Sequence, residues 1–388
     1  MKTLHIHIGT PKTGTTALQN FCGENRSVLE AKGYCYPKFS FIYQGIPMVR
    51  NAHFLTAPIF DEHGKRSKEK ETQRFLDGIK EICRLFERVD HVVISDESIW
   101  KCMDSSRKTL WKDLKAEAEQ AGFKIHVIVY LRRQDDFLGS LYNQRIKDGK
   151  VSLYKSSFEE FTDKLDLQIR MEYYTKLERI ADIIGKESIT VRRYEMESYQ
   201  GGNIYSDFLF SLGLSLTEEY KISQGIRNIG LYGNTLEMKR ILNSLPQLED
   251  QEAQNFMMQM LMRFSEVSKK AYPCQMFSKE EAKAFLEQYN SDNRRIAEEY
   301  LKEPGKELFH STDKDLPKWE KDNPYMLDDV IRFIGVTGIY LFQENLSLKQ
   351  KLNSMEKEFR SLKYKIRHPV RSAFGFAKRK LRQNAAKE

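Results

Sequence analysis

The chain opens with the stretch Thr3-Leu4-His5-Ile6-His7-Ile8-Gly9-Thr10-Pro11-Lys12-Thr13-Gly14-Thr15-Thr16, which predicts a strand, a loop and the first turn of a helix. A helix N-terminus presents unpaired N–H groups and the positive end of the helix dipole, so it favours anions. Threonine hydroxyls and a lysine add further donors. We therefore predict a phosphate or sulfate site here, with six candidate residues: Pro11, Lys12, Thr13, Gly14, Thr15 and Thr16.

This loop differs from a Walker A loop, in which the lysine directly follows the second glycine. Here Thr15 follows Gly14, and Lys12 lies two residues before that glycine. No acidic residue in the Walker B manner follows the second predicted strand. A P-loop nucleotide kinase or related phosphotransferase is therefore kept only as an alternative.

Outward from this loop, apolar runs predict strands at residues 4–8, 91–95, 125–131 and 189–193. Helical patterns separate the strands, at residues 16–32, 68–88, 109–120, 136–147 and 173–184. From Tyr232 onward the patterns are helical, including those at residues 235–243, 252–270 and 279–302. Strands that alternate with helices predict crossover connections and a mostly parallel sheet. We expect an α/β fold, a P-loop-like three-layer αβα sandwich, with a helical C-terminal part at about 232–340.

Composition supports a globular protein. The 388 residues are 40% hydrophobic and 30% charged, enough for a buried core. No run approaches the ~18 apolar residues of a membrane span, and because the first strand follows Met1 almost at once we expect no signal peptide. The five cysteines form no C-x-x-C pair, so we expect a reducing cytoplasm, no disulfide framework and no cysteine zinc site.

The net charge of +8 lies in one region. The last 43 residues hold 13 Lys and Arg against 3 Asp and Glu, a net of +10, which leaves the other 345 residues at −2. A nucleic-acid enzyme more often has a basic stripe across its body, so we expect no nucleic-acid partner. We divide the chain into a domain at 1–340, a coiled-coil-like helix at 341–368 and a basic amphipathic tail at 369–388.

The helix and the tail each allow two interpretations. Apolar residues spaced by four and three predict the seam of a short coiled coil, which a homodimer would bury, or else a helix packed back on the body. These residues are Leu341, Leu348, Leu352, Met355, Phe359, Leu362 and Ile366, with Asn345 interrupting the seam. After Pro369, apolar and basic residues intermix, which suits an anionic membrane surface or else a solvated terminus.

The P-K-T-G-T-T string at Pro11 resembles the 5′-phosphosulfate loop of sulfotransferases that use 3′-phosphoadenosine 5′-phosphosulfate (PAPS). It is similar to bacterial members and to the N-sulfotransferase domain of heparan sulfate enzymes, which carry K-T-G-T-T-A-L. In that family the lysine contacts the bridging oxygen and the transferring sulfuryl group. The resemblance implies that Lys12 does so here, that PAPS is the donor and adenosine 3′,5′-bisphosphate the product, and that no metal is needed.

A second motif fits the same family, which binds the 3′-phosphate with an arginine at a strand end and a serine eight residues later. Arg132 and Ser140 have this spacing after the third predicted strand, with Arg133 as the alternative. Arginine offers a bidentate fork to phosphate oxygens. By the same resemblance Tyr194 touches the adenine and Arg227 meets the 3′-phosphate, although a packed tyrosine is an equal interpretation of Tyr194.

Sulfuryl transfer also needs a base on the acceptor side. Glu97 follows the second predicted strand, where cytosolic sulfotransferases carry a catalytic histidine and other members a glutamate. Asp96 is its immediate rival, and His53, in the loop region 34–60 that is expected to meet the acceptor, is the second candidate. An aromatic cluster in that region could stack on a sugar or belong to the core: Tyr34, Tyr36, Phe39, Phe41 and Tyr43. His5 and His7 are interpreted as strand residues.

Taken together, the sequence predicts a cytoplasmic PAPS-dependent sulfotransferase, peripheral on the inner membrane. It would transfer sulfate to a hydroxyl, or alternatively an amine, of a glycan or glycolipid in bacterial surface polysaccharide biosynthesis. A non-catalytic membrane-associated scaffold is the other alternative, and intact Lys12, Arg132 and Ser140 argue against it.

Overall fold

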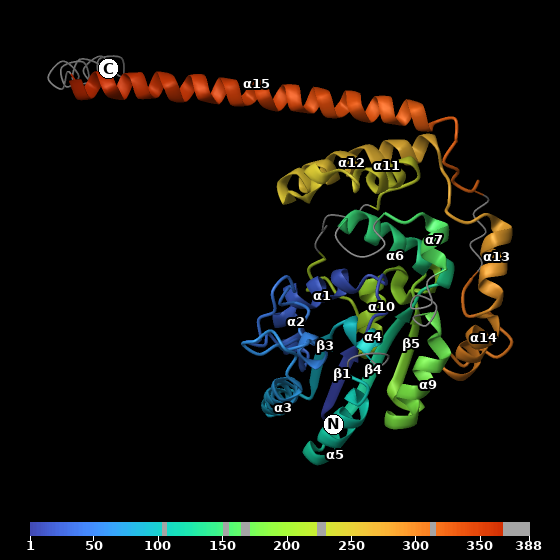
Figure 1. Cartoon of the computed structure of the whole chain (residues 1–388). Coiled ribbons are helices and arrows are strands. Elements are labelled where there is room, and N and C mark those ends of the chain that lie inside the picture. The colour runs from blue at the N-terminus through green and yellow to red at the C-terminus, as the bar shows by residue number, and fades with distance from the viewer. Residues whose placement is uncertain (103–106, 150–154, 164–170, 223–229, 311–315, 368–388) are drawn as a thin grey trace, which may run out of the picture.

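A five-stranded parallel sheet forms the centre of the computed structural model, which describes residues 1–102, 107–149, 155–163, 171–222, 230–310 and 316–367 (Figure 1). The strand order is β2-β3-β1-β4-β5. The strands are β1 (Thr3–His7), β2 (Tyr34–Cys35), β3 (His91–Ser95), β4 (Lys124–Leu131) and β5 (Ile189–Arg193). The four predicted strands are therefore confirmed. The prediction missed β2, because two residues are too few to show a hydrophobic pattern.

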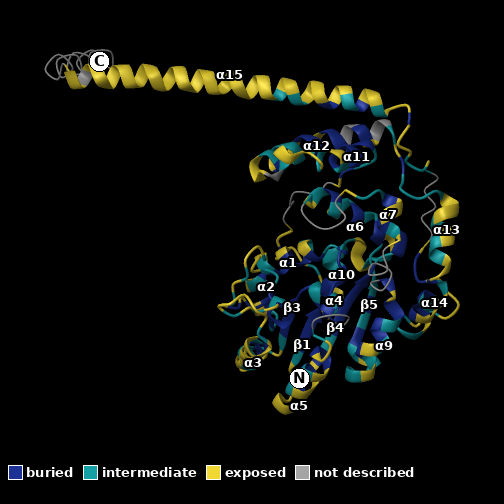
Figure 2. Ribbon diagram, viewed as in Figure 1, coloured by how far each residue is buried: buried dark blue, intermediate teal, exposed yellow. Residues whose placement is uncertain are grey.

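Helices cover both faces of the sheet, so the predicted three-layer α/β sandwich is confirmed. One apolar cluster joins α1 (Thr15–Glu24) and α10 (Ile204–Ser211) to Val93 and Ile128 of the sheet. The other joins α3 (Lys68–Leu85), α5 (Leu110–Ala121) and α9 (Tyr173–Ile184) to Ile6 and Val127. Successive side chains of a strand point to opposite faces, and each face here buries its own core. Figure 2 shows β1, β3 and β4 as mostly buried strands.

The remaining helices follow the same chain order. Those of the α/β part are α2 (Arg26–Ala31), α4 (Ser98–Cys102), α6 (Gln134–Asp148) and α7 (Phe158–Thr162). Those of the predicted helical C-terminal part, which is confirmed, are α11 (Asn234–Leu242), α12 (Gln251–Ala271), α13 (Lys279–Glu287), α14 (Asn290–Glu299) and α15 (Met326–Arg367). Short 3-10 turns occur at His53–Leu55, Lys186–Ser188, Met196–Ser198, Gln200–Gly202 and Pro246–Glu249.

Two of the predicted helices are each divided into two helices in the structure. The pattern at 16–32 breaks at Asn25, whose side-chain amide donates to the carbonyls of Phe21 and Lys221 at 2.9 and 2.8 Å. This bond ties the chain to a segment nearly 200 residues away, which no local pattern can reveal. The pattern at 279–302 breaks before α14, where Tyr289 buries its ring. The helix predicted from residue 341 is the later part of α15, which begins at Met326.

The strand register sets the position of the site. β1 pairs with β3 on one side and with β4 on the other, and β4 pairs with β5, all in parallel. The carboxyl ends of these four strands therefore share one edge of the sheet. Ligands of open α/β sheets bind at this edge, where the strand order reverses. Predicted site residues follow each of β1, β3, β4 and β5: Lys12, Glu97, Arg132 and Tyr194.

Candidate functional site

The loop after β1 is held against β4 before it turns. The N–H of Thr10 donates to the carbonyl of Tyr130 at 2.9 Å, and the N–H of Tyr130 donates to Gly9 at 2.6 Å. The loop then turns through Gly14, at φ +72°, into α1. A Cβ at Gly14 would lie 2.7 Å from Ile204 Cδ1 and 3.2 Å from a ring carbon of Tyr194. Only glycine therefore allows this turn to pass so close to Tyr194.

Five of the six predicted loop residues line one cavity of about 2380 Å³: Pro11, Lys12, Gly14, Thr15 and Thr16. Thr13 is the exception among them. Its side chain is buried, and its hydroxyl donates to the carbonyl of Thr10 at 2.5 Å. Thr13 therefore braces the loop, while its neighbours face the cavity.

The second predicted motif reaches the same cavity. Arg132 and Ser140 both line it, and Nη1 of Arg132 donates to the carbonyl of Lys12 at 3.1 Å. The guanidinium carbon of Arg132 also lies 5.6 Å from the ring centre of Tyr194, which lines the cavity too. Two motifs 120 residues apart are thus in direct contact. Both fit an anionic nucleotide, because cationic and hydroxyl groups gather around a helix N-terminus.

Arg133, the alternative to Arg132, has a different environment. Its Nε and Nη2 donate to the two carboxylate oxygens of Asp135 at 2.7 and 2.9 Å. This bidentate pair occupies the fork that a phosphate would need. The geometry therefore favours Arg132 as the phosphate ligand. The remaining phosphate candidate, Arg227, lies outside the described residues.

The lowered pKa of Lys12 also points to an anion site in this cavity. Burial lowers the pKa of Lys12, and the nearby charges of Lys147 and Arg132 lower it further, against Asp148 and Glu97, which raise it. Positive groups crowded in a partly buried site repel one another, so a bound anion relieves that repulsion. Lys147 and Asp148 were not among the site residues predicted from the sequence. Lys147 follows Ser140 by seven residues, two turns along one face of α6, and this spacing could have found it.

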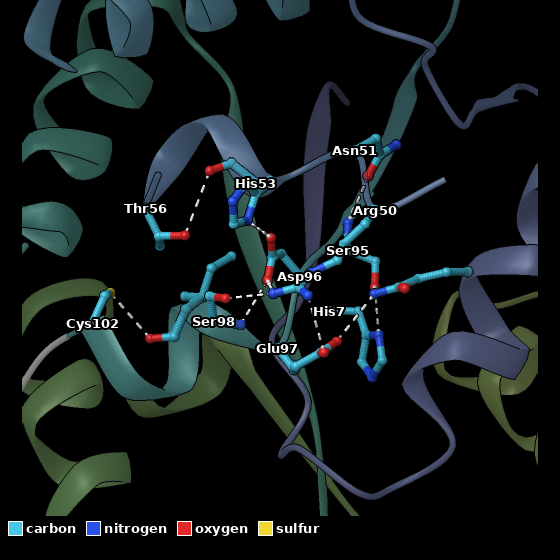
Figure 3. Close-up of polar contacts among 12 residues, drawn as sticks. His7, Arg50, Asn51, His53, Thr56, Ser95, Asp96, Glu97, Ser98 and Cys102 are labelled. Atoms are coloured by element: carbon cyan, nitrogen blue, oxygen red, sulfur yellow. Dashed lines mark hydrogen bonds and ion pairs between the residues drawn. The ribbon is translucent and has the colours of Figure 1, made fainter. Parts of the chain in front are cut away.

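The two acidic residues after β3 lie in different surroundings (Figure 3). The carboxylate of Asp96 is fully buried, and it accepts hydrogen bonds from Arg50 Nη2 at 2.7 Å and from the N–H of Ser98 at 2.6 Å. Nδ1 of His53 lies 2.7 Å from its other oxygen. Burial alone would raise the pKa of Asp96, but the contacts with His53 and Arg50 outweigh burial and hold the pKa below its usual value. Asp96 is therefore an ionised structural group.

Glu97 faces the other way and lines the cavity, with 21% of its side chain exposed. Its carboxylate oxygens lie 3.4 Å from Arg50 Nη1 and 3.4 Å from Gln19 Nε2. A Cβ on Gly9 would lie 3.0 Å from Glu97 Cβ, so this acid packs against the start of the phosphate loop. Of the three predicted base candidates, Glu97 is the one that can reach a ligand beside Lys12.

His53, the second base candidate, does not line this cavity. Its ring is largely buried between Asp96 and Tyr43, whose ring centre lies 4.9 Å away, edge to face. Arg50, which the sequence analysis left unassigned, does line the cavity and bridges Asp96 to Glu97. The contacts thus run from His53 to Asp96, from Asp96 to Arg50 and from Arg50 to Glu97. Of these four residues, Arg50 and Glu97 line the cavity.

The aromatic residues of the expected acceptor loop are mostly core. Tyr34, Tyr36 and Phe39 are buried, and Phe39 stacks with Phe41 at 5.6 Å. The cavity instead continues toward the helical C-terminal part. Residues at that end include Tyr232, Lys269, Phe277, Lys283 and Leu286. No sequence pattern marked these residues, because they come together only when α11, α12 and α13 pack over the sheet edge.

The described residues contain neither a candidate metal site nor a candidate membrane-spanning helix. Nowhere in the described ranges do three or more His, Cys, Asp or Glu side chains gather in a way that could hold a metal ion. Among the helices of those ranges, none has the length and apolarity needed to cross a membrane.

The chain is similar over part of its length to two known proteins. No protein-family model matches the sequence. An uncharacterized protein of Archaeoglobus fulgidus is 32% identical over 180 residues, which cover 45% of this chain and 45% of that protein. The chain thus matches less than half the length of this curated relative. A crystal structure of a sulfotransferase from Alicyclobacillus acidocaldarius covers 66% of this chain and 99% of its own, with a TM-score of 0.35 and 16% identity. The function proposed below therefore rests on the site residues.

Proposed function

We propose that this protein transfers a sulfuryl group from PAPS to a hydroxyl group of a glycan acceptor, with an amine as the alternative acceptor. One observation carries the proposal: Lys12, Arg132, Ser140 and Glu97 line a single cavity at the carboxyl edge of the sheet. The first three belong to two motifs that are far apart in the sequence. Their convergence is what a nucleotide with two separate anionic groups requires.

The described residues fit such a donor. The N-terminus of α1, Lys12, Thr15 and Thr16 would hold the 5′-phosphosulfate, because N–H groups, hydroxyls and a cation converge there. Arg132 and Ser140 would hold the 3′-phosphate. Tyr194, which packs against Gly14 and Arg132, would contact the adenine.

The residues then have separate roles in transfer. PAPS supplies the sulfuryl group, whose bond to the phosphate oxygen breaks as the bond to the acceptor oxygen forms. Glu97 accepts the proton of the acceptor hydroxyl, and Arg50 and Gln19 hold its carboxylate in place. Lys12 stabilises the negative charge that appears on the departing phosphate oxygen.

The acceptor would occupy the part of the cavity beside α11, α12 and α13. Tyr232 and Phe277 offer ring faces for the apolar side of a sugar, and Lys269 and Lys283 offer hydrogen-bond donors. We further propose that the basic residues 369–388 hold the protein at the cytoplasmic face of an inner membrane, where lipid-linked glycans are built. Bacterial surface polysaccharide or glycolipid is the acceptor class that fits this location.

Ligand binding gives the first test. Adenosine 3′,5′-bisphosphate should raise the melting temperature, and ATP with magnesium should raise it less. The reverse order would establish a phosphotransferase instead. If saturating bisphosphate fails to stabilise the protein, the donor assignment is wrong.

Transfer from labelled PAPS to a panel of glycans is the second test. Lys12→Ala should abolish transfer, and Lys112→Ala, a change at an exposed lysine on α5, is the matched control. Transfer that is unchanged in Lys12→Ala would overturn the mechanism.

A further inference from the structure

The C-terminal helix α15 has two parts with different surroundings. Its first part packs on α12: Phe333 lies 6.0 Å from Phe264 and Tyr340 lies 6.1 Å from Phe256, measured between ring centres. Beyond Tyr340 every residue of α15 whose side chain is described is exposed (Figure 2). Figure 1 shows this second part running past the N-terminal end of α12, away from the sheet. It has about 27 residues, roughly 40 Å of helix.

Such a helix needs a partner. Isolated helices are marginal in water, and most helical stability comes from burying an apolar face. Here that face is present and uncovered. Between 48% and 76% of each of these seam residues is exposed: Leu341, Leu348, Leu352, Met355, Phe359, Leu362 and Ile366.

The seam follows a strict heptad, with Asn345, Leu352, Phe359 and Ile366 at a positions. The d positions are Leu341, Leu348, Met355 and Leu362. The same register extends back through α15, where Ile334 at d and Ile331 at a are 63% and 58% exposed. Leucine at d and a single asparagine at a favour a two-stranded coil with one fixed register.

Charges beside the seam select the partner. In a parallel, in-register pair, each g residue faces the e residue five positions later on the other helix. The three g–e pairs are Glu344 with Lys349, Lys351 with Glu356, and Glu358 with Lys363. All three join opposite charges. The signs also alternate along each flank, unlike the single-sign basic face of a helix that lies on an anionic membrane.

We propose that α15 pairs with α15 of a second copy of this chain, as a parallel, in-register coiled coil over residues 341–366. The interaction goes beyond the proposed function and does not depend on it. It would hold two α/β bodies at one end of the coil. It would also bring the two copies of Arg367 together at the other end.

The mass of the full chain in solution is the first measurement. Analytical ultracentrifugation at low micromolar concentration should give a dimer. A monomer would overturn the proposal, and a monomer that binds anionic vesicles through α15 would identify a membrane as the occupant of the seam. A trimer or tetramer would overturn the two-stranded arrangement.

Charge reversal tests the flanks. One double variant, Glu344→Lys with Glu358→Lys, places like charges opposite one another, and so does Lys349→Glu with Lys363→Glu. Each should weaken self-association at least about tenfold. Mixing the two should restore a dimer, because every reversed pair is then complementary again.

A matched control carries the same charge change on the outer face of the helix. Lys357→Glu with Arg360→Glu lie at f and b positions, so this variant should dimerise like the parent. Equal weakening of the control and the e-position variant would overturn the pairing of flanks, since net charge alone would then explain the loss.

Orientation needs a separate experiment. In a parallel, in-register coil each d residue faces its own copy, so Leu348→Cys and Leu362→Cys should each form an intermolecular disulfide under mild oxidation. An antiparallel coil can bring at most one of these positions to its own copy. Crosslinking at one position only would therefore overturn the parallel arrangement.

Discussion

Asp96 and Glu97 are consecutive residues at the end of β3, yet they belong to two different regions of the molecule. Asp96 lies in a buried network, with its carboxylate fully covered and contacted by Arg50, His53 and the N–H of Ser98. Glu97 lies in the cavity with its carboxylate partly exposed. Neighbours in sequence at a strand end point to opposite sides, so Asp96 faces inward and Glu97 faces the cavity.

The comparison teaches what makes a carboxylate available for proton transfer. A base must reach the proton of the acceptor, and Asp96 has no open approach to it. Its partners also hold its pKa below the usual value, which makes it a poorer base. Glu97 has access and is held by Arg50 and Gln19 at 3.4 Å each. In the proposed mechanism, the buried network therefore holds Arg50 in position, and Glu97 in the cavity accepts the proton.

The largest expected effect comes from the cavity side. Glu97→Gln removes the base and keeps the shape, so kcat for sulfuryl transfer should fall about 10²–10⁴-fold. Binding of adenosine 3′,5′-bisphosphate, measured by calorimetry, should change little. If kcat is unchanged, Glu97 is not the base. If nucleotide affinity falls together with kcat, Glu97 contributes to binding instead.

The next effect should come from the buried side. Asp96→Asn leaves the Arg50 guanidinium and the His53 ring without their carboxylate, so the free energy of unfolding should fall by about 2–3 kcal/mol. Denaturant unfolding measures this loss. Glu97→Gln is the control and should leave stability nearly unchanged, because Glu97 is partly solvated. Equal destabilisation by both variants would contradict the division between the two regions.

The sequence alone was enough to predict four strands of the sheet and the position of the loop after β1, because local patterns encode both. The apolar runs predicted four strands, and the order of glycine, lysine and threonine predicted the loop. The base could not be decided in the same way. Asp96, Glu97 and His53 all remained open, because the choice depends on which side chains meet across 43 or more residues. Arg50 was missed for the same reason, because its role comes from the neighbours that folding gives it. Lys147 was missed although its seven-residue spacing from Ser140 along α6 is visible in the sequence.

A smaller effect should separate the neighbouring arginines after β4. Arg132→Ala should weaken adenosine 3′,5′-bisphosphate about 10–100-fold, since a charge-assisted contact to phosphate is lost. Arg133→Ala should have a much weaker effect, because its fork is already bound to Asp135. Fluorescence or calorimetric titration of both variants measures the difference. A larger loss in Arg133→Ala would reassign the 3′-phosphate to that residue.

The smallest expected effect is a pH dependence that reports on Lys12. The charged ammonium group of Lys12 would bind the anion. Affinity for the anion should therefore be highest below the pKa of Lys12 and should decline as pH rises through that pKa. Burial, with repulsion from Lys147 and Arg132, lowers that pKa, so the decline should begin at lower pH than for an exposed lysine. Affinity for adenosine 3′,5′-bisphosphate, titrated from about pH 8 upward, should therefore fall at lower pH than binding through an exposed lysine would. Lys147→Gln removes one repelling charge and should move the decline to higher pH, even though it weakens binding at neutral pH. A decline at the same pH in both proteins would mean that Lys147 does not act on Lys12.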